Sequence, residues 1–425
     1  VELEDVKFMY FDTLFSFDRS AQTSEIGTTG ARMYLDKNSL SFYPAEQIKL
    51  TPRITPWYLS EDRLELVWSS SDPTVASVTD DGTITGLKEG STTIYLQVKV
   101  DGRLSNIMAT LRVNIKNPFV IENRTLVAYK GLGGDVVIPD DKGILYIGEY
   151  AFALYTTDRT IQNPDDDDDY NKTPGTNSTI KSVTIPEGVE DIKKYAFYNC
   201  TALETVTLPS TIRYVREYAF SYNTNAITSD GKAASSSLAN INLKDVEVIG
   251  AHAFANCTKL TSLDLSTCYA IGNEAFLGCT GLTTVDISKL RNSGSGVFKN
   301  CTNLTSYVTD SKGQTRLGEE MFYNSGLTTA AINSTQIPAR AFANCAELKS
   351  IVVNGNVVTI GDYAFANNPK LESIIVNGSV EYLNQNAMAN NVNLFSVTLP
   401  NSIVNVQDGV LSGNIKLEEV KFQKN

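Results

Sequence analysis

The chain has 425 residues, which is too long for one ordinary hydrophobic core and predicts several domains or one stacked array. Its 36 basic and 48 acidic residues give a net charge of -12, which disfavours nucleic acid and anionic membranes as partners. A single histidine, His252, leaves little material for histidine metal sites or a Ser-His-Asp triad, so we expect no enzyme and no cofactor. No stretch approaches the ~20 apolar residues that a membrane span needs, so we expect no membrane insertion of the folded chain.

Residues 1–31 match neither of the two patterns that follow them and stay unassigned. Residues 6–17 are apolar enough to pack as a strand or a short helix. The chain starts at Val1 without a basic-then-apolar leader, as a processed chain would, and this says nothing against export.

Residues 32–117 contain short alternating runs separated by turn signals. The pair Asp81-Gly82 lies between two such runs, and Asp-Gly between strands is a hairpin signal. Regular short strands of this kind predict an all-β sandwich. The segment resembles the bacterial Ig-like group 2 domain, because residues 68–76 carry its W-S-S-x-D-x-x-V-A signature and residues 82–90 its G-x-I-T-G-L-x-x-G signature. The resemblance implies a spacer.

Residues 118–425 are dominated by a repeat. A large apolar residue, usually preceded by a small one, recurs every 20 to 24 residues away from two insertions, and a Leu six residues later usually opens a strand-like run. The large residues, called here the Phe column, are Phe152, Phe197, Phe220, Phe254, Phe276, Phe298, Phe322, Phe342, Phe365, Met388 and Leu411.

A unit of about 22 residues cannot bury its apolar side alone, but stacked copies can. We expect about 11 repeats, each with one strand and one short helical or irregular segment, and an N-terminal cap at residues 118–139. The expected fold class is mixed α/β: a leucine-rich-repeat solenoid with a parallel β-sheet, preceded by the all-β Ig-like sandwich.

Residues 189–209 show the full pattern, with Ile192, Phe197, Cys200, Leu203 and Leu208 at its apolar positions. The pattern resembles the BspA-like, or treponemal-type, leucine-rich repeat. That resemblance implies an exported protein of the bacterial cell surface, anchored at the outer membrane or secreted. It also implies adhesion to a host protein or to another cell.

The six cysteines follow the repeat. Five of them come three residues after the Phe column, where other repeats have Asn, and Cys268 occupies an apolar column. We therefore expect free, buried, structural thiols; disulfides or a metal cluster are the alternatives, although no CxxC occurs. The cysteines are Cys200, Cys257, Cys268, Cys279, Cys301 and Cys345.

A row of small hydroxyl residues marks the first candidate binding surface. It lies two residues after each Leu and is predicted to face outward from the sheet. The row suits contact with a protein better than sugar binding, since Phe395 is its one aromatic neighbour; plain cross-strand pairing is the alternative. The candidate residues are Ser262, Thr284, Ser350, Ser373, Ser396 and Phe395.

Two insertions, residues 155–179 and 223–237, fall at the same point of the repeat and are candidates for recognition. The first contains Asp165, Asp166, Asp167, Asp168 and Asp169, followed by Tyr170. Five aspartates could bind Ca²⁺, but the EF-hand spacing is missing and a charge run is more often a solvated loop.

Tyr195 and Tyr218 share a column two residues before the Phe column and form another candidate patch. Simple coverage of the outer side is the alternative. His252 lies in the same column, which accepts many residue types, so we expect it to be exposed and without a catalytic role.

No P-loop, G-x-S-x-G or H-E-x-x-H motif is present, and a carboxylate pair is the one enzymatic arrangement left open. The sequence thus predicts a non-enzymatic surface protein whose solenoid recognises a protein ligand. A glycan-binding surface module and a structural component of a surface assembly are the alternatives.

Overall fold

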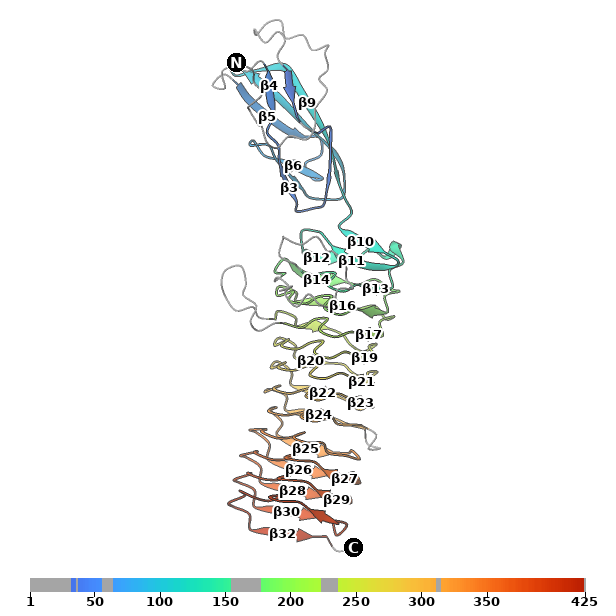
Figure 1. The fold of residues 1–425 in the computed structure, drawn as a ribbon, viewed down its shortest axis with the longest axis vertical. Helices are drawn as coiled ribbons and strands as arrows, with labels where there is room; N and C mark the ends of the chain where they lie inside the picture. The colour runs from blue at the N-terminus through green and yellow to red at the C-terminus, as the bar shows by residue number, and fades with distance from the viewer. Residues whose placement is uncertain are drawn as a thin grey trace, which may run out of the picture. The chain divides into compact units, whose positions relative to one another are not determined.

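The computed structural model describes residues 32–35, 37–55, 64–153, 177–222, 236–310 and 315–423 (Figure 1). The chain divides into two compact units, Val1–Val120 with Tyr129–Leu132, and Ile121–Ala128 with Gly133–Asn425. The insertion residues 154–176 and 223–235, and the unassigned residues 1–31, lie outside the described residues.

The first unit is built from antiparallel and mixed sheets. The long hairpin of β8 (Gly90–Val100) and β9 (Arg103–Ile115) alternates buried and exposed residues, as a half-buried sheet requires. It turns at Asp101 and Gly102, which both have positive φ. The remaining described strands are β1 (Arg32–Tyr34), β2 (Ser39–Phe42), β3 (Gln47–Lys49), β4 (Arg53–Thr55), β5 (Leu64–Ser70), β6 (Ala76–Val78) and β7 (Thr83–Gly86).

The strand order is β2-β9-β8-β5 in one sheet and β3-β7-β6 in another. The residues of the W-S-S-x-D-x-x-V-A signature build the core and a turn between the sheets. Trp68 is 8% exposed and Ala76 is fully buried. Asp72 accepts hydrogen bonds from the backbone N–H and the hydroxyl of Thr74, and so fixes the turn between β5 and β6.

The second unit is a solenoid in which most described turns have two strands. Side A carries the strand after each Leu: β12 (Gly134–Val137), β14 (Ile180–Thr184), β16 (Thr205–Thr207), β18 (Asn240–Ile241), β20 (Ser262–Leu263), β22 (Thr284–Asp286), β24 (Ser306–Val308), β25 (Thr329–Ile332), β26 (Ser350–Val353), β28 (Ser373–Val376), β30 (Ser396–Leu399) and β32 (Glu419–Phe422). They pair in parallel within three sheets, β12-β14-β16-β18, β20-β22-β24 and β25-β26-β28-β30-β32.

Side B carries the second strand of a turn, which the turns of Phe322 and Phe342 lack among their described residues. After β10 (Phe119–Glu122) and β11 (Thr125–Tyr129), its strands are β13 (Tyr146–Ile147), β15 (Asp191–Ile192), β17 (Tyr214–Val215), β19 (Val248–Ile249), β21 (Ala270–Ile271), β23 (Asn292–Ser293), β27 (Val357–Ile360), β29 (Val380–Leu383) and β31 (Asn405–Val406). The Phe arc, defined as the segment that contains the Phe column, links side B to the next strand of side A.

The expected mixed α/β class is wrong. The protein has essentially no helix and its repeat region is a β-solenoid of about 11 turns. Within the described residues the single helical element is the 3₁₀ turn η3 (Asp140–Lys142). The Phe arc cannot be helical, because the residues two before and two after the Phe column take positive φ, as at Tyr195 (57°) and Asn199 (55°). An α-helix needs φ near -63° at every position.

The Phe column forms the centre of the core. All nine of its phenylalanines are 0–2% exposed, and successive rings stack through much of the column, as at Phe197 and Phe220, whose centroids are 4.9 Å apart. Neighbouring arcs bond through their backbones at the residue before the Phe, which is usually Ala: the N–H of Phe197 donates to the carbonyl of Ala219 at 2.8 Å. No helix among the described residues is long and apolar enough to cross a bilayer.

Candidate binding surface

The hydroxyl row lies on side A and is in register within each of two sheets, one with Ser262 and Thr284 and one with Ser350, Ser373 and Ser396. Ser262 pairs with Thr284, and Ser350 pairs with Ser373, which in turn pairs with Ser396. The sequence spacing of the repeat positions each hydroxyl at the start of its strand, so the parallel ladder aligns them. Ser262 and Thr284 are exposed and the three serines of the later turns are half-buried.

The hydroxyls of these five residues make no hydrogen bond to another part of the described chain. Elsewhere on side A the same position is bonded, as where Ser182 Oγ lies 2.7 Å from Asp135 Oδ1. Nearby threonines are also used internally, since Thr283 Oγ1 donates to the carbonyl of Thr261 at 3.2 Å. The row therefore keeps donors and acceptors that a ligand can use, and cross-strand pairing does not consume them.

Phe395 lies beside this row in an open hollow of about 630 Å³. Its ring is 47% exposed, and Ile415 nearby is 80% exposed. Charged chains border the hollow: Lys370 Nζ lies 2.6 Å from Glu347 Oε2 and Lys416 Nζ donates to Asn393 Oδ1 at 2.7 Å. The hollow combines an apolar centre with a charged rim, which is the composition of a protein contact surface.

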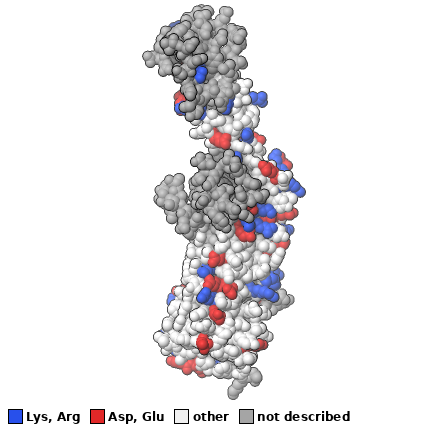
Figure 2. Space-filling model, viewed as in Figure 1, with Lys and Arg blue, Asp and Glu red and all other residues white. Residues whose placement is uncertain are grey.

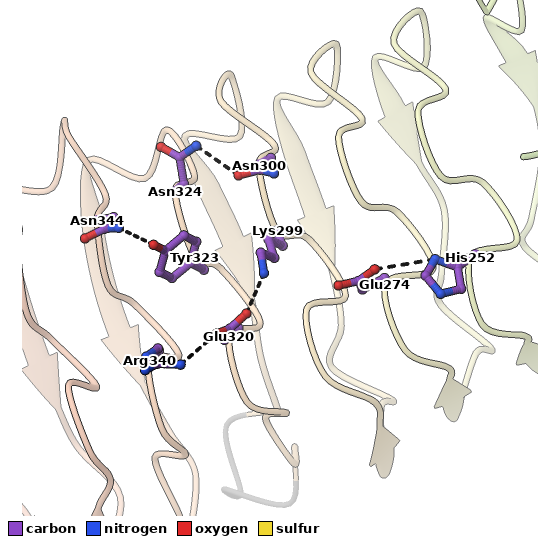
Figure 3. A network of polar contacts seen from close by, with 9 residues as sticks. All are labelled: His252, Glu274, Lys299, Asn300, Glu320, Tyr323, Asn324, Arg340 and Asn344. Atoms are coloured by element: carbon purple, nitrogen blue, oxygen red, sulfur yellow. Dashed lines mark hydrogen bonds and ion pairs between the residues drawn. The ribbon is translucent and has the colours of Figure 1, made fainter. Parts of the chain in front are cut away.

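The Phe arc presents a different surface, on which polar groups bond to one another across turns (Figure 3). Glu320 binds Lys299 Nζ at 2.6 Å and the Arg340 guanidinium at 3.3 Å. The Asn324 amide donates to Asn300 Oδ1 at 2.9 Å. The hydrogen bond from Lys299 holds the pKa of Glu320 below its ordinary value. These contacts occupy the polar groups of Glu320, Lys299 and Asn324 within the protein.

The side chains of the tyrosine column also contact one another. Tyr195 stacks on both Tyr150 and Tyr218, with centroids 4.9 Å apart in each pair. Tyr195 and Tyr218 are half-buried, and desolvation, followed by the neighbouring tyrosines, raises the pKa of Tyr195 to about 12. The stack covers ring faces that a ligand would need and leaves mainly the ring edges.

His252 is half-buried and not exposed as expected. It continues the tyrosine stack at 4.7 Å from the Tyr218 centroid, and its Nδ1 lies 3.5 Å from Glu274 Oε2 (Figure 3). Its backbone has φ 54°, like the other members of the column. The members of this column share a backbone turn with positive φ. Their variety in residue type therefore does not mean that their side chains are fully exposed.

All six cysteines are buried free thiols in the core. The five in the column after Phe each donate to the carbonyl oxygen of a Phe in the preceding turn, as Cys279 does to Phe254 at 3.1 Å. Cys268 instead donates to the carbonyl of Ala270 at 3.4 Å. Burial raises the pKa of the thiols, to about 12 for Cys257 and Cys301. A neutral buried thiol is a poor nucleophile and a poor metal ligand.

The asparagines that replace cysteine in this column do more than the sequence suggested. Asn368 Oδ1 accepts the N–H of Cys345 at 2.7 Å, and its Nδ2 donates to the carbonyl of Phe365 at 2.8 Å. Asn391 accepts the N–H of Asn368 in the same way at 2.8 Å. The signal that could have revealed this role is the alternation of Asn with Cys at one buried position.

A second asparagine column, two residues after Phe, was also missed. Asn256, Asn300 and Asn344 have φ of 60–63°, and Gly278 takes the same place with φ 68°. Asn and Gly are the residues that most readily adopt a left-handed backbone, so their recurrence at one phase is a readable sign of a turn.

The aspartate run Asp165–Asp169 and Tyr170 lie outside the described residues, so the Ca²⁺ hypothesis and the insertion site stay predictions. Among the residues that the structure does describe, no group of three His, Cys, Asp or Glu side chains could hold a metal ion. Figure 2 shows Lys and Arg mixed with Asp and Glu between broad uncharged areas, and not gathered into a field of one sign.

Two family models match the chain. The BspA type leucine-rich repeat region, in 6 copies, matches residues 134–230, 230–338 and 335–425. The bacterial Ig-like domain of group 2 matches residues 32–105. Because the repeat model covers more than half of the sequence, the chain belongs to the BspA-type leucine-rich repeat family and carries an N-terminal bacterial Ig-like domain.

Similar solved structures include a leucine-rich repeat protein from Bacteroides ovatus, with 19% identity, TM-score 0.41, and coverage of 73% of this chain and 83% of that one. A leucine-rich cell surface protein from Faecalibacterium prausnitzii has 17% identity, TM-score 0.32, and coverage of 72% and 93%. The pneumococcal vaccine antigen PcpA has 19% identity, TM-score 0.37, and coverage of 71% and 81%. These likenesses are too distant to support a functional inference.

One curated relative, an alpha-L-arabinofuranosidase from Bifidobacterium longum, is 35% identical over 83 residues. The match spans 19% of this chain and 7% of the length of that enzyme. So short a match does not carry the activity of the relative to this chain.

Proposed function

We propose that this chain is a non-enzymatic recognition protein of the bacterial cell surface, in which side A of the solenoid binds a protein ligand and the Ig-like domain acts as spacer. Membership of the BspA-type family supports export and surface display. The ligand is a protein of the host or of another bacterial surface.

The observation that carries the proposal is the contrast between side A and the Phe arc. On side A, the hydroxyls of Ser262 and Thr284 and those of Ser350, Ser373 and Ser396 are aligned within their two sheets and unbonded, and Phe395 is 47% exposed beside them. On the arc, the charged and amide groups are paired across turns. A flat row of available hydroxyls with one aromatic anchor suits a broad protein contact.

The test is a binding screen of the full chain against arrays of host and bacterial surface proteins, and in parallel against a glycan array. We expect a protein ligand whose affinity falls about tenfold or more with Phe395→Ala, as for an anchor residue. Ser373→Arg should weaken it similarly, because the long side chain projects from the row.

Val358→Arg is the matched control, since Val358 is a 46% exposed residue of side B. It should leave binding unchanged. Binding of soluble glycans without any protein ligand would overturn the proposal in favour of a glycan-binding module, for which the Phe395 ring in its hollow is the favouring observation. Equal loss with Val358→Arg would show that side A is not the contact surface.

A further inference from the structure

A row of exposed apolar side chains lies beside the hydroxyl row on side A. In β28 the side chains of Ser373 and Ile375 point outward, because the residues that alternate with them are buried. Ile375 is 37% exposed, and Val308, at the corresponding position of β24, is 51% exposed. The apolar row consists of the residues at this position in successive turns: Val308, Ala331, Val352 and Ile375.

The repeat does not require an apolar residue at this position. Thr184, Thr207 and Thr398 occupy it in other turns, and Thr398 is the register partner of Ile375. Threonine is β-branched and favours strands, as valine and isoleucine do. The exposed apolar surface of Val308 and Ile375 is therefore not explained by strand formation, and a contiguous row of this kind marks a contact surface.

The two turns before the apolar row carry carboxylates at the same position. Asp286 is the register partner of Val308, and Asp264 lies one turn earlier. These two aspartates are the only charged residues of the segments 260–265, 282–287 and 304–309. Each accepts the backbone N–H two residues later, at 3.0 Å for Asp264 and 2.9 Å for Asp286, and neither forms an ion pair within the described chain. Hydrogen bonds from Ser266 hold the pKa of Asp264 below its ordinary value, so this carboxylate is ionised at neutral pH.

We propose that this path on side A binds one extended segment of the protein ligand, with Lys or Arg side chains facing Asp264 and Asp286 and apolar side chains facing the apolar row. The inference rests on the proposed function and names the chemistry of the ligand segment. Charge complementarity selects the occupant, because two carboxylates without an ion pair at one end disfavour an acidic segment and would be desolvated without compensation by a wholly apolar one.

The spacing of the turns sets the length of the segment. The path from Asp264 to Ile375 crosses β20, β22, β24, β25, β26 and β28, which follow one another along the solenoid (Figure 1). Neighbouring strands lie about 4.8 Å apart, so the path is about 24 Å long, and an extended chain that rises about 3.3 Å per residue covers it with about eight residues. Alternate side chains of the segment face the sheet. The unbonded hydroxyls of Thr284 and Ser350 lie beside the path and are available to the backbone of the segment.

The experiment selects peptides of this length from a random display library on the full chain and measures the dissociation constant of a selected synthetic peptide. We expect enriched sequences with Lys or Arg in one half and apolar residues at alternate positions of the other. Asp264→Asn with Asp286→Asn keeps an oxygen that accepts each backbone N–H but removes both charges, and should raise the dissociation constant on the order of tenfold. Val352→Thr with Ile375→Thr keeps the β-branched shape and should raise it on the order of tenfold as well.

Asp362→Asn and Val358→Thr are the matched controls and should leave the dissociation constant unchanged. Asp362 is exposed and Val358 is 46% exposed, and Val358 lies in β27 of side B with Asp362 shortly after that strand. A library without enriched sequences overturns the inference, as does enrichment of acidic or uncharged sequences, or a basic and apolar peptide whose binding the two double variants leave unchanged. Peptides of another composition that lose binding with Ser373→Arg would remove this inference alone and leave the proposed function standing. Peptides whose binding no side A variant changes would contradict both.

Discussion

Two regions of the solenoid solve the same packing problem with different chemistry. In the Cys turns, residues 252–308, the column after Phe holds Cys257, Cys279 and Cys301; in the Asn turns, residues 363–422, it holds Asn368, Asn391 and Asn414. Each thiol makes one weak bond to a carbonyl of the preceding turn, whereas each buried amide both accepts an N–H and donates to a carbonyl.

The strands of side A also differ in length between these two regions. They have two or three residues in the Cys turns and four in the Asn turns, as β20 and β28 show. The amide can bridge two turns because it carries a donor and an acceptor, while a thiol is a weak donor on a small apolar side chain. The position three residues after the Phe column can therefore hold either an asparagine that links two turns by hydrogen bonds or a cysteine that mainly fills space in the core.

Raising the pH should have the largest effect on the difference in stability between the Cys turns and the Asn turns. The thiols of Cys257 and Cys301 have pKa values raised by burial from 9.0 to about 12. A raised folded pKa contributes stability that is present below pH 9 and is lost as the pH rises toward 12. At pH 10.5 each of these thiols should lower the free energy of unfolding by about 2 kcal/mol relative to its value below pH 9.

Urea unfolding at pH 7 and pH 10.5 measures this loss. The double variant Cys257→Ala with Cys301→Ala should lose about 4 kcal/mol less over this pH interval than the parent chain. Lysines and tyrosines titrate equally in both chains, so the difference isolates the thiols. An identical loss in the two chains would contradict the role of the buried thiols.

Asn368→Ala should have the next largest effect. It removes the acceptor of the Cys345 N–H and the donor to the Phe365 carbonyl at a site that is 0% exposed. Leaving these backbone groups unpaired should cost about 3 kcal/mol in the free energy of unfolding.

Cys279→Ala is the matched variant, because it removes a single thiol bond of 3.1 Å in the same column. Its cost should be about 1 kcal/mol. Urea unfolding of the two variants measures the difference. Equal losses in the free energy of unfolding for the two variants would show that the hydrogen bonds of the asparagine amide contribute no more to stability than the thiol does.

Glu320→Gln should have the smallest effect and sharpens the comparison at the turn between the two regions. Because the folded pKa of Glu320 is lowered, its pairing contributes stability above pH 4.5 that is lost as the pH falls through the folded pKa. The variant should lose about 0.5 kcal/mol at pH 7 and less at low pH. Unfolding curves at the two pH values measure this, with Glu347→Gln, an exposed pair, as control.

Much of the solenoid could be predicted because a structural repeat leaves a periodic pattern in the sequence. The Phe column, its spacing and the Leu that opens each side A strand follow from burial, and burial leaves a periodic apolar pattern. The register of Ser262 with Thr284 follows from the same spacing. The part of the Phe arc before the Phe column could not be read in this way, because positive φ at Tyr195, His252 or Arg340 leaves no mark in residue type.

Residue types and their spacing were enough to identify the family, the repeat and the residues that point inward, since apolar burial requires particular side chains at particular phases. Which polar groups form hydrogen bonds within the protein, and which remain available to a ligand, is known only from the three-dimensional structure. The hydrogen bonds of Asn368 and the stack at Tyr195 and His252 join residues from different turns. Such contacts depend on which turn lies beside which, and a pattern along one chain does not contain the side-chain geometry across the stack.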